Sequence, residues 1–323
     1  MPHTELAFRP VHELAADVAA RRLSPVDLID AFLTRIEAQE PKLQAFVEGY
    51  AEDARRAARG ADEMIRSGHA VGPLHGIPVA LKDLIEIEGK GVTGGCEVWR
   101  QRKATRTATL ARRLIAQGMI VLGKTHTVEF AMGGWGTNSR LGTPWNPWDP
   151  KRRRTPGGSS SGSGVAVAAG LAPWAVGTDT GGSVRLPASW CGITALKTSV
   201  GRVSTYGVLP LSPTLDTPGP MTRTVEDAAL MYAAMQGPDP LDPRTERLTF
   251  TDPMPEARPR WRNSSDSEPR SCPLRCPAAS PMWLPSTSVS WRPRATPFFM
   301  SSSTIRPRPS TSTCGPASLP VET

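Results

Sequence analysis

The feature that most constrains the fold is a change of composition near residue 245. Residues 245–323 hold 14 prolines, 14 serines and 10 arginines, but one glycine and no lysine. From Pro253 onward the prolines stand two to ten residues apart. This spacing forbids a helix longer than about two turns, because proline lacks the amide hydrogen that a helix interior needs. A folded core must therefore come from the first 244 residues, which hold the other 28 glycines and all seven lysines.

Two explanations of this C-terminal segment remain open. A disordered tail accounts for its polarity and its prolines. Its three tryptophans and three cysteines are unusual in such a tail, and Arg, Pro, Ser, Trp and Cys without Lys is what a GC-rich gene yields in the wrong reading frame. We therefore expect residues 251–323 to be a low-complexity segment, disordered or out of frame, after one domain at 1–250.

The charge and the cysteines exclude several classes of partner. Of the net charge of +8, the segment 245–323 carries +4 (10 Arg against 6 acidic residues) and the first 244 residues carry +4 (28 basic against 24 acidic). Neither part has the basic clustering of a nucleic-acid surface, so no direct nucleic-acid partner is expected. No apolar run of 18 residues and no secretory signal is visible, and five scattered cysteines suggest no disulfide framework. We expect a cytoplasmic protein without membrane contact.

The first 250 residues alternate between helical and strand patterns. Apolar periodicity and capping signals predict helices at 11–19, 24–40, 51–67, 107–117 and 224–236, and small residues at 165–170 suggest a further helix start. Short apolar runs predict strands at 76–81, 119–122 and 173–176. Helices that alternate with continuous apolar strands indicate an α/β sheet covered on both faces.

One segment has the spacing of a nucleotide-binding loop but not its chemistry. Gly118-Met-Ile-Val-Leu-Gly-Lys-Thr125 matches the P-loop spacing. A P-loop needs a flexible turn whose amides face phosphate, whereas the middle residues here are bulky and apolar. We interpret the segment as a strand and expect no nucleotide there.

The strongest functional signal lies in two loops rich in glycine and serine, at 156–164 and 176–187. Apolar segments flank both loops, so a flexible linker is implausible. Two Gly-Gly-Ser turns suggest close approach of the backbone to another group. Successive amides of Thr180, Gly181, Gly182 and Ser183 could converge on one developing oxyanion. A serine beside such a cluster of amides is a candidate nucleophile.

A nucleophilic serine needs a base, and the sequence offers two kinds. The five histidines show no recognisable Ser-His-Asp order, and His126 beside a strand end is the best of them. The alternative is Lys82, which follows an apolar strand, where burial would lower its pKa and make the neutral amine available. A lysine at a strand end is, however, more often a solvated charge.

The arrangement of these motifs resembles the amidase signature family. Pro156-Gly-Gly-Ser-Ser-Ser-Gly162 is similar to its serine-rich motif, Gly177-Thr-Asp-Thr-Gly-Gly-Ser-Val-Arg185 to its nucleophile motif, and Gly76-Ile-Pro-Val-Ala-Leu-Lys-Asp83 to its lysine motif. Further agreeing blocks are Glu129-Phe-Ala-Met-Gly-Gly134, Asn146-Pro-Trp-Asp-Pro150 and Cys191-Gly-Ile-Thr-Ala-Leu-Lys197. The resemblance covers residues 5–250. It implies a mixed central β-sheet flanked by helices on both faces.

The resemblance also implies a catalytic triad. Ser183 would be the nucleophile, Ser159 a bridging serine held by a cis peptide, and Lys82 the base. Amides from Thr180 to Ser183 would hold the oxyanion. The implied mechanism proceeds through an acyl-enzyme and needs neither a metal nor an organic cofactor.

Further residues receive roles by the same resemblance. Met132 and Gly133, together with Ser159, would contact the acyl part of the substrate. Asp179 and Arg185 would support the nucleophile loop, with a structural salt bridge favoured over substrate contact for Arg185.

Three functions are compatible with these motifs. The first is an amidase that hydrolyses a small-molecule amide, with a homodimer as a possible assembly. The second is the glutaminase-like subunit of a glutamyl/aspartyl-tRNA amidotransferase, which uses the same catalytic triad and works with tRNA-binding partners. The third is an inactive truncated product, because family members continue well past this length with ordered α/β sequence, so the domain would be incomplete at its C-terminus. The sequence departs from the family pattern once more at Ser161, where glycine is common.

Overall fold

Six strands form one mixed sheet, which organises the part of the chain that the computed structural model describes, residues 3–246 and 248–253. Across the sheet the strands follow the order β1 (Phe46–Gly49), β3 (Ile120–Thr125), β2 (Pro78–Lys82), β4 (Ala175–Asp179), β6 (Thr217–Thr222) and β5 (Thr194–Ala195). β2 runs parallel to both β3 and β4, and the other neighbours are antiparallel. The described residues all fall within one compact unit, Met1–Asn263.

The central strands are covered on both faces. Every residue of β2, β4 and β6 is buried. Because successive side chains of a strand point to opposite faces, an unbroken run of buried residues requires packing on both sides. This confirms the predicted α/β sheet flanked by helices.

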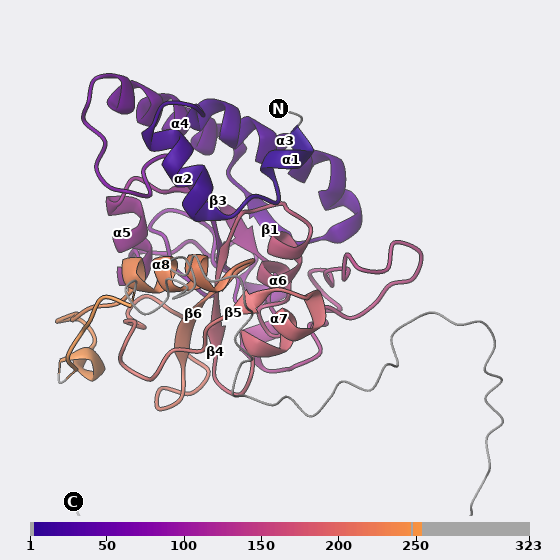
Figure 1. Ribbon diagram of the computed structural model, residues 1–323. Coiled ribbons are helices and arrows are strands. Elements are labelled where there is room, and N and C mark those ends of the chain that lie inside the picture. Colours follow the sequence, from indigo (N-terminus) through magenta and orange to yellow (C-terminus); the bar gives the residue numbers. More distant parts are fainter. Residues whose placement is uncertain (1–2, 247, 254–323) are drawn as a thin grey trace, which may run out of the picture. The chain divides into compact units, whose positions relative to one another are not determined.

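The helices and short 3₁₀ turns surround this sheet (Figure 1). The helices are α1 (His3–Leu6), α2 (Val11–Ala19), α3 (Pro25–Leu43), α4 (Ala51–Arg66), α5 (Thr109–Ala116), α6 (Ser161–Ala168), α7 (Arg185–Cys191) and α8 (Val225–Met235). The 3₁₀ turns are η1 (Glu97–Trp99), η2 (Glu129–Ala131) and η3 (Pro243–Thr245). Helix α6 packs against β2, β3, β4 and β6, while α8 packs against β5 and β6. Figure 1 shows the N-terminal helices, in indigo and purple, gathered at one end of the view.

The predicted helices and strands are present with small shifts of their ends. Two helices begin at predicted capping residues: Ser24 Oγ accepts a hydrogen bond from Val26 N at 3.1 Å, and Thr224 Oγ1 accepts one from Asp227 N at 3.0 Å. The helix start expected at 165–170 belongs to α6, which begins earlier, at Ser161. The segment with P-loop spacing forms β3, as its apolar residues predict.

Three strands and the short helices α1 and α7 were not predicted. β1 and β5 have four and two residues, which is too short for a periodic pattern. β6 reads Thr-Pro-Gly-Pro-Met-Thr, a composition that local propensity assigns to a turn. Tertiary pairing with β4 makes it a strand, with both edges bonded to neighbours.

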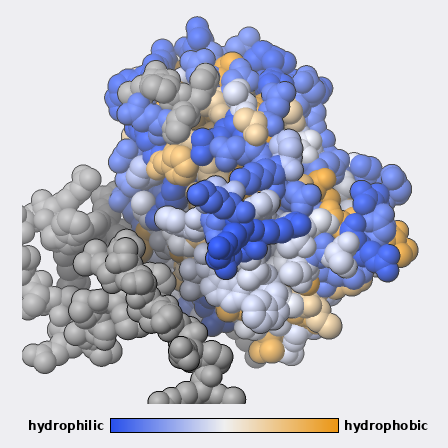
Figure 2. Space-filling view, turned by 90° about the vertical axis from the view of Figure 1, so that its right-hand side faces the viewer, coloured by the Kyte–Doolittle hydropathy of each residue, from blue (hydrophilic) through white to orange (hydrophobic). Residues whose placement is uncertain are grey.

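Two other expectations meet the described part of the chain only in part. The predicted low-complexity segment, apart from residues 251–253, lies outside the described residues. Within the described residues, no helix combines the length and the apolar character that crossing a membrane requires. On the face shown in Figure 2, hydrophobic residues are scattered in small patches among polar ones.

Candidate active site

Lys82 ends the buried strand β2, at the edge of the sheet where β2 and β4 both end. Its side chain is fully buried, and Nζ donates hydrogen bonds to Ser159 Oγ at 2.7 Å and to Thr178 Oγ1 at 2.8 Å. Because β2 and β4 are parallel neighbours, their carboxyl ends bring Lys82 and Thr178 to the same edge of the sheet.

The surroundings of Lys82 favour its neutral form. Burial lowers the pKa of Lys82 to about 7, against the opposing influence of the carboxylates of Asp179 and Asp216. A low-dielectric site disfavours the ammonium ion, and hydroxyl groups compensate less than a carboxylate in direct contact would. Near neutral pH the amine is therefore available as a proton acceptor, as expected for a lysine buried at the end of an apolar strand.

Ser159 lies in the loop that leads into α6. It is fully buried, and the peptide bond between Gly158 and Ser159 is cis. The backbone around it is fixed on both sides: Val128 N donates to Ser159 O at 3.1 Å, and Gly158 N donates to Gly134 O at 2.7 Å. Its hydroxyl thus stands beside the Lys82 amine in a rigid setting.

Ser183 lies in the turn between β4 and α7. It is 8% exposed, and its carbonyl accepts a hydrogen bond from Ser160 N at 3.2 Å. This backbone link places the two serine-bearing loops side by side. Within the described residues, no hydrogen bond joins the hydroxyls of Ser159 and Ser183, so the structure brings Lys82 and Ser159 into direct contact but not the complete chain of three groups.

The four backbone amides of residues 180–183, called the nucleophile turn after the role expected for Ser183, differ in their hydrogen-bond partners. That the amides from Thr180 to Ser183 hold one oxyanion stays a prediction. Among them, Gly182 N already donates to Asp179 Oδ1 at 2.7 Å. The amides of Thr180, Gly181 and Ser183 have no hydrogen-bond acceptor among the described residues. These three remain as candidate oxyanion donors.

The carboxylate of Asp179 fixes the conformation of this turn. This buried carboxylate accepts hydrogen bonds from Gly182 N, from Val184 N at 3.1 Å and from Arg185 Nε at 3.0 Å. Burial alone would raise the pKa of Asp179, but the bonds from Arg185, Val184 and Gly182 outweigh it and hold the pKa below its ordinary value. Arg185 is engaged with Asp179 through two nitrogens, in the supporting geometry expected for it.

Met132 and Gly133 lie in the segment that follows η2, and both are exposed. The Met132 side chain is 74% exposed. The two preceding residues, Phe130 and Ala131, adopt positive φ angles of 45° and 62°, which is uncommon for residues with a side chain. The substrate contacts expected for Met132 and Gly133 stay predictions.

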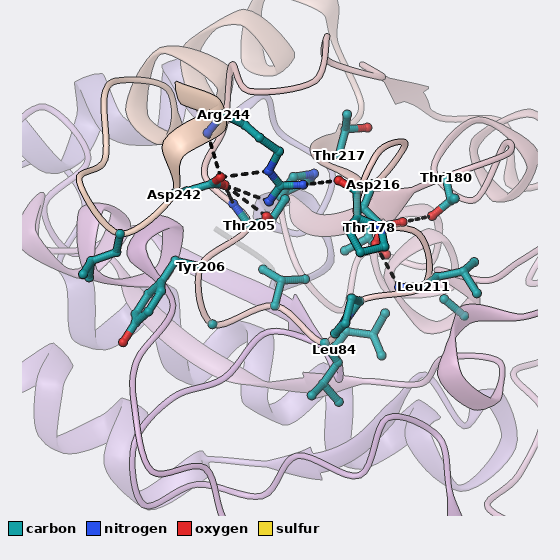
Figure 3. Close-up of a pocket in the computed structure, with 18 of the residues that line it drawn as sticks. Leu84, Thr178, Thr180, Thr205, Tyr206, Leu211, Asp216, Thr217, Asp242 and Arg244 are labelled. Carbon is teal, nitrogen blue, oxygen red and sulfur yellow. Dashed lines mark hydrogen bonds and ion pairs between the residues drawn. The ribbon is translucent and has the colours of Figure 1, made fainter. Parts of the chain in front are cut away.

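A cavity of about 390 Å³ opens next to Thr178 and Thr180 (Figure 3). Its walls come mainly from residues 205–218 and 241–244, together with Leu84 and Ala131. Arg244 reaches across one side, where it donates to both carboxylate oxygens of Asp242 and to Pro213 O. The cavity wall is largely apolar, and the charged groups just named in it are paired with one another.

Sequence reasoning missed two residues that the structure places at the site. Thr178 is the second hydroxyl partner of Lys82, and it could have been found from the pairing of two parallel strands had β4 been extended to Asp179. Asp216 accepts a hydrogen bond from the Thr180 hydroxyl and also lines the cavity. No sequence signal marked Asp216, because it lies in a stretch without a predicted element.

The alternative base, His126, is not part of this arrangement. Burial lowers the pKa of its imidazole to about 4, which keeps the ring neutral, and Nδ1 is buried without a partner among the described residues. Its backbone, by contrast, is bonded to Ala45 and Gly162. Within the described residues, no group of three histidine, cysteine or acidic side chains could hold a metal ion.

Comparison with known proteins gives a consistent picture. A family model described as Amidase matches residues 27–291. Similar proteins include the A subunit of glutamyl-tRNA(Gln) amidotransferase of Cupriavidus taiwanensis (47% identity; 75% of this chain, 48% of the relative) and 2-amino-5-chloromuconic acid deaminase of Comamonas testosteroni (47% identity; 69% and 48%). Among solved structures, the native peptide amidase from Stenotrophomonas maltophilia aligns with a TM-score of 0.71 at 39% identity, over 76% of this chain and 52% of that one. The chain spans about half the length of the curated relatives that it matches.

Proposed function

Because the chain belongs to the amidase family, we propose that it hydrolyses a carbon–nitrogen amide bond to a carboxylate and ammonia or an amine. The observation that carries this proposal is the buried amine of Lys82, 2.7 Å from Ser159 Oγ, with the serine-bearing turn of Ser183 alongside. A buried lysine bonded to hydroxyls rather than to a carboxylate is suited to accept protons.

The proposed relay moves two protons in the first step. Neutral Lys82 takes a proton from the Ser159 hydroxyl, and Ser159 takes one from Ser183 as its oxygen attacks the amide carbonyl. A neutral amine has one lone pair and two N–H bonds, so it can accept from Ser159 while it donates to Thr178. Thr178 would hold the lone pair of the amine toward Ser159.

The negative charge of the tetrahedral intermediate falls on the former carbonyl oxygen. The unengaged amides of Thr180, Gly181 and Ser183 are the donors proposed for it. Fixed amides stabilise developing charge without the reorganisation that water would need. The bond from Gly182 N to Asp179 keeps the turn that bears these amides in one conformation.

The remaining steps return the protons. As the carbon–nitrogen bond breaks, the ammonium form of Lys82 gives its proton back through Ser159 to the leaving nitrogen, and Ser183 remains acylated. Water then attacks the acyl-enzyme with the same relay as base, which releases the carboxylate and restores Ser183. The proposed sequence of steps uses no cofactor, and we propose that none takes part.

The proposed substrate is a small-molecule carboxylic amide. Met132 and Gly133 would contact it at the exposed side of the site, and the 390 Å³ cavity beside Thr178 and Thr180 offers room for a substituent. Its largely apolar wall suits an uncharged substituent better than a charged one.

A second candidate function is supported by the names of several relatives. Proteins named as the A subunit of glutamyl-tRNA(Gln) amidotransferase share 43–48% identity with this chain. In that case the ammonia released from an amide would be passed to a partner instead of to solvent. Formation of a stable complex with tRNA-binding subunits, together with amide hydrolysis that depends on them, would favour this function.

The test of the proposed function is the replacement of the nucleophile. Ser183→Ala is expected to abolish release of ammonia from a panel of primary amides, measured with a coupled ammonia assay. Ser189→Ala changes an exposed serine on α7 in the same region and should retain full activity. Unchanged hydrolysis by Ser183→Ala would refute the relay. If the wild-type chain hydrolyses no amide, either by itself or with partner subunits, this result would instead support the third function considered, an inactive truncated product.

A further inference from the structure

The segment 209–217, which precedes and opens β6, is tied to the nucleophile turn by a single carboxylate. One oxygen of Asp216 accepts hydrogen bonds from Leu211 N at 2.8 Å and Ser212 N at 2.9 Å. The other accepts a hydrogen bond from the Thr180 hydroxyl. Figure 3 shows Asp216 at the wall of the cavity, with dashed lines that join it to Leu211 and to Thr180.

These bonds limit what Asp216 can do. The residue is 8% exposed, and three donors already occupy its carboxylate. It is therefore poorly placed to transfer protons or to bind a substrate group itself. Its contact with Thr180 is a contact with the first residue of the turn that bears the candidate oxyanion donors.

We propose that Asp216 is a positioning residue for the amidase reaction: through the Thr180 hydroxyl it fixes the turn 180–183, so that the amides of this turn and Ser183 meet the substrate carbonyl in register. This inference rests on the proposed function. Asp179 anchors the turn at Gly182 and Val184, and Asp216 anchors its other end at Thr180. The carboxylates of Asp179 and Asp216 thus fix the two ends of the turn 180–183 by hydrogen bonds.

Asp216 also contributes charge to the base. The carboxylates that raise the proton affinity of Lys82 are Asp179, at the end of β4, and Asp216. On the other side, β3 carries Lys124, whose partner is Asp83 at 3.5 Å, and α6 has no ionisable side chain. Removing the charge of Asp216 therefore moves the midpoint of Lys82 titration to lower pH. The neutral amine is the proposed base, so kcat/KM falls at acidic pH as Lys82 becomes protonated. This fall, the acid limb of the pH profile, therefore also moves to lower pH.

The experiment compares substitutions that separate the hydrogen bond from the charge. Asp216→Asn removes the charge and replaces one carboxylate oxygen by an NH2 group. This group cannot accept a hydrogen bond from Leu211 N or from the Thr180 hydroxyl. Thr180→Val removes only the hydroxyl, whereas Thr180→Ser retains it. The first two variants are expected to lower kcat roughly 10- to 100-fold, somewhat less than the loss of a direct oxyanion donor. Thr180→Ser should stay within a few-fold of wild type.

The pH profile distinguishes positioning from a merely structural role. Asp216→Asn should move the acid limb downward by at least a few tenths of a pH unit, and Thr180→Val should leave it in place. Asp239→Asn is the matched control. Asp239 is a buried carboxylate that likewise accepts bonds from a hydroxyl, that of Ser204, and from a backbone amide, that of Leu241, but it does not touch the nucleophile turn. It should change neither kcat nor the acid limb.

The rate of Ser183 labelling by a fluorophosphonate is measured on the same variants and does not require hydrolysis. It should fall in Asp216→Asn and Thr180→Val, with the same pH shift in the former. Wild-type kcat, labelling rate and acid limb in Asp216→Asn would overturn the inference, as would equal effects in Asp239→Asn. A failure of the proposed function is recognised separately, by amide hydrolysis that persists in Ser183→Ala.

Discussion

Two buried lysines occupy neighbouring strands of this protein in different electrostatic settings. Lys124 on β3 keeps a carboxylate, Asp83, at 3.5 Å. Among the described residues, the hydrogen-bond partners of Lys82 on β2 are the hydroxyls of Ser159 and Thr178. Burial lowers the pKa of both amines, and at Lys82 the direct partners that offset it are hydroxyls, which stabilise an ammonium ion less than a carboxylate does. The lysine proposed as the base is thus also a residue whose burial lowers the stability of the fold.

This cost has a pH dependence that can be measured. The pKa of Lys82 is about 7 in the fold against 10.5 for the unfolded chain. Between these values the unfolded chain holds a proton that the folded protein lacks, so the contribution of Lys82 to stability rises with pH. We expect Lys82→Met to be most favourable relative to wild type near pH 7 and to lose that advantage toward pH 10.5. Urea unfolding across this range measures the difference, and a constant difference would contradict the assignment of a depressed pKa.

At the scale of elements, the close approach of α6 to the sheet depends on glycine. A Cβ atom added at Gly162 would lie 2.2 Å from Ala45 O and 2.4 Å from His126 N. Both are backbone atoms that cannot move without disturbing the ends of β1 and β3. Helix α6, which follows Ser159, can therefore lie this close to the sheet because residue 162 has no side chain.

Gly162→Ala is accordingly expected to destabilise the protein by roughly 1–3 kcal/mol or more. Gly60→Ala is the matched control, because Gly60 lies inside α4 with no atom within 4 Å of an added Cβ. Alanine should stabilise that exposed helix position by about 0.5–1 kcal/mol. Chemical denaturation of both variants checks the pair, and similar effects of the two substitutions would refute the packing argument.

The junction between α3 and β1 carries a second titratable group. Glu40 Oε1 accepts a hydrogen bond from Phe46 N at 2.8 Å, while Oε2 is buried without a partner among the described residues. Burial raises the pKa of Glu40 from 4.5 to about 7, against the opposing bonds from Phe46 and Ala45.

This raised pKa predicts a fall in stability as the pH increases from about 4.5 to about 7, because the folded protein holds a proton that the unfolded chain releases. Glu40→Gln keeps an acceptor for Phe46 N but cannot ionise. The variant should lose this part of the pH dependence, so that its stability relative to wild type improves between pH 5 and pH 7. Thermal unfolding midpoints over this range provide the measurement, and parallel curves would exclude Glu40 as the source.

At the scale of the whole molecule, the expected domain boundary near residue 250 can be tested by deletion. The described core is assembled from residues up to 253, and its sheet is paired within that range. Removing residues 254–323 is expected to change the thermal midpoint by less than about 4 °C, the shift that roughly 1 kcal/mol produces in a domain of this size. Loss of cooperative unfolding after the deletion would place part of the folded core in that segment.

Homodimer formation stays a prediction. The elution volumes of the full chain and of the shortened chain in size-exclusion chromatography would test it.

Much of the fold could be predicted from local patterns. Helices with an apolar face and a capping serine or threonine, such as α3 and α8, are specified within a few residues of sequence. Strand β6 could not be predicted, because its prolines and glycine favour a turn until β4 and β5 offer hydrogen-bond partners. Pairing of this kind joins segments that are far apart in the chain, and no local pattern encodes it.

The site divides in the same way. The sequence by itself determined which groups are present: a lysine after an apolar strand, two serine-rich loops and a glycine-rich turn, all carried by motifs of a few residues. Only the tertiary structure decided that Lys82 is fully buried between hydroxyls, that Gly182 N is already occupied, and that Asp216 reaches Thr180 from 36 residues away. The reason is physical: burial and hydrogen-bond partners belong to the packed sheet and its loops, and these exist only once distant segments have come together.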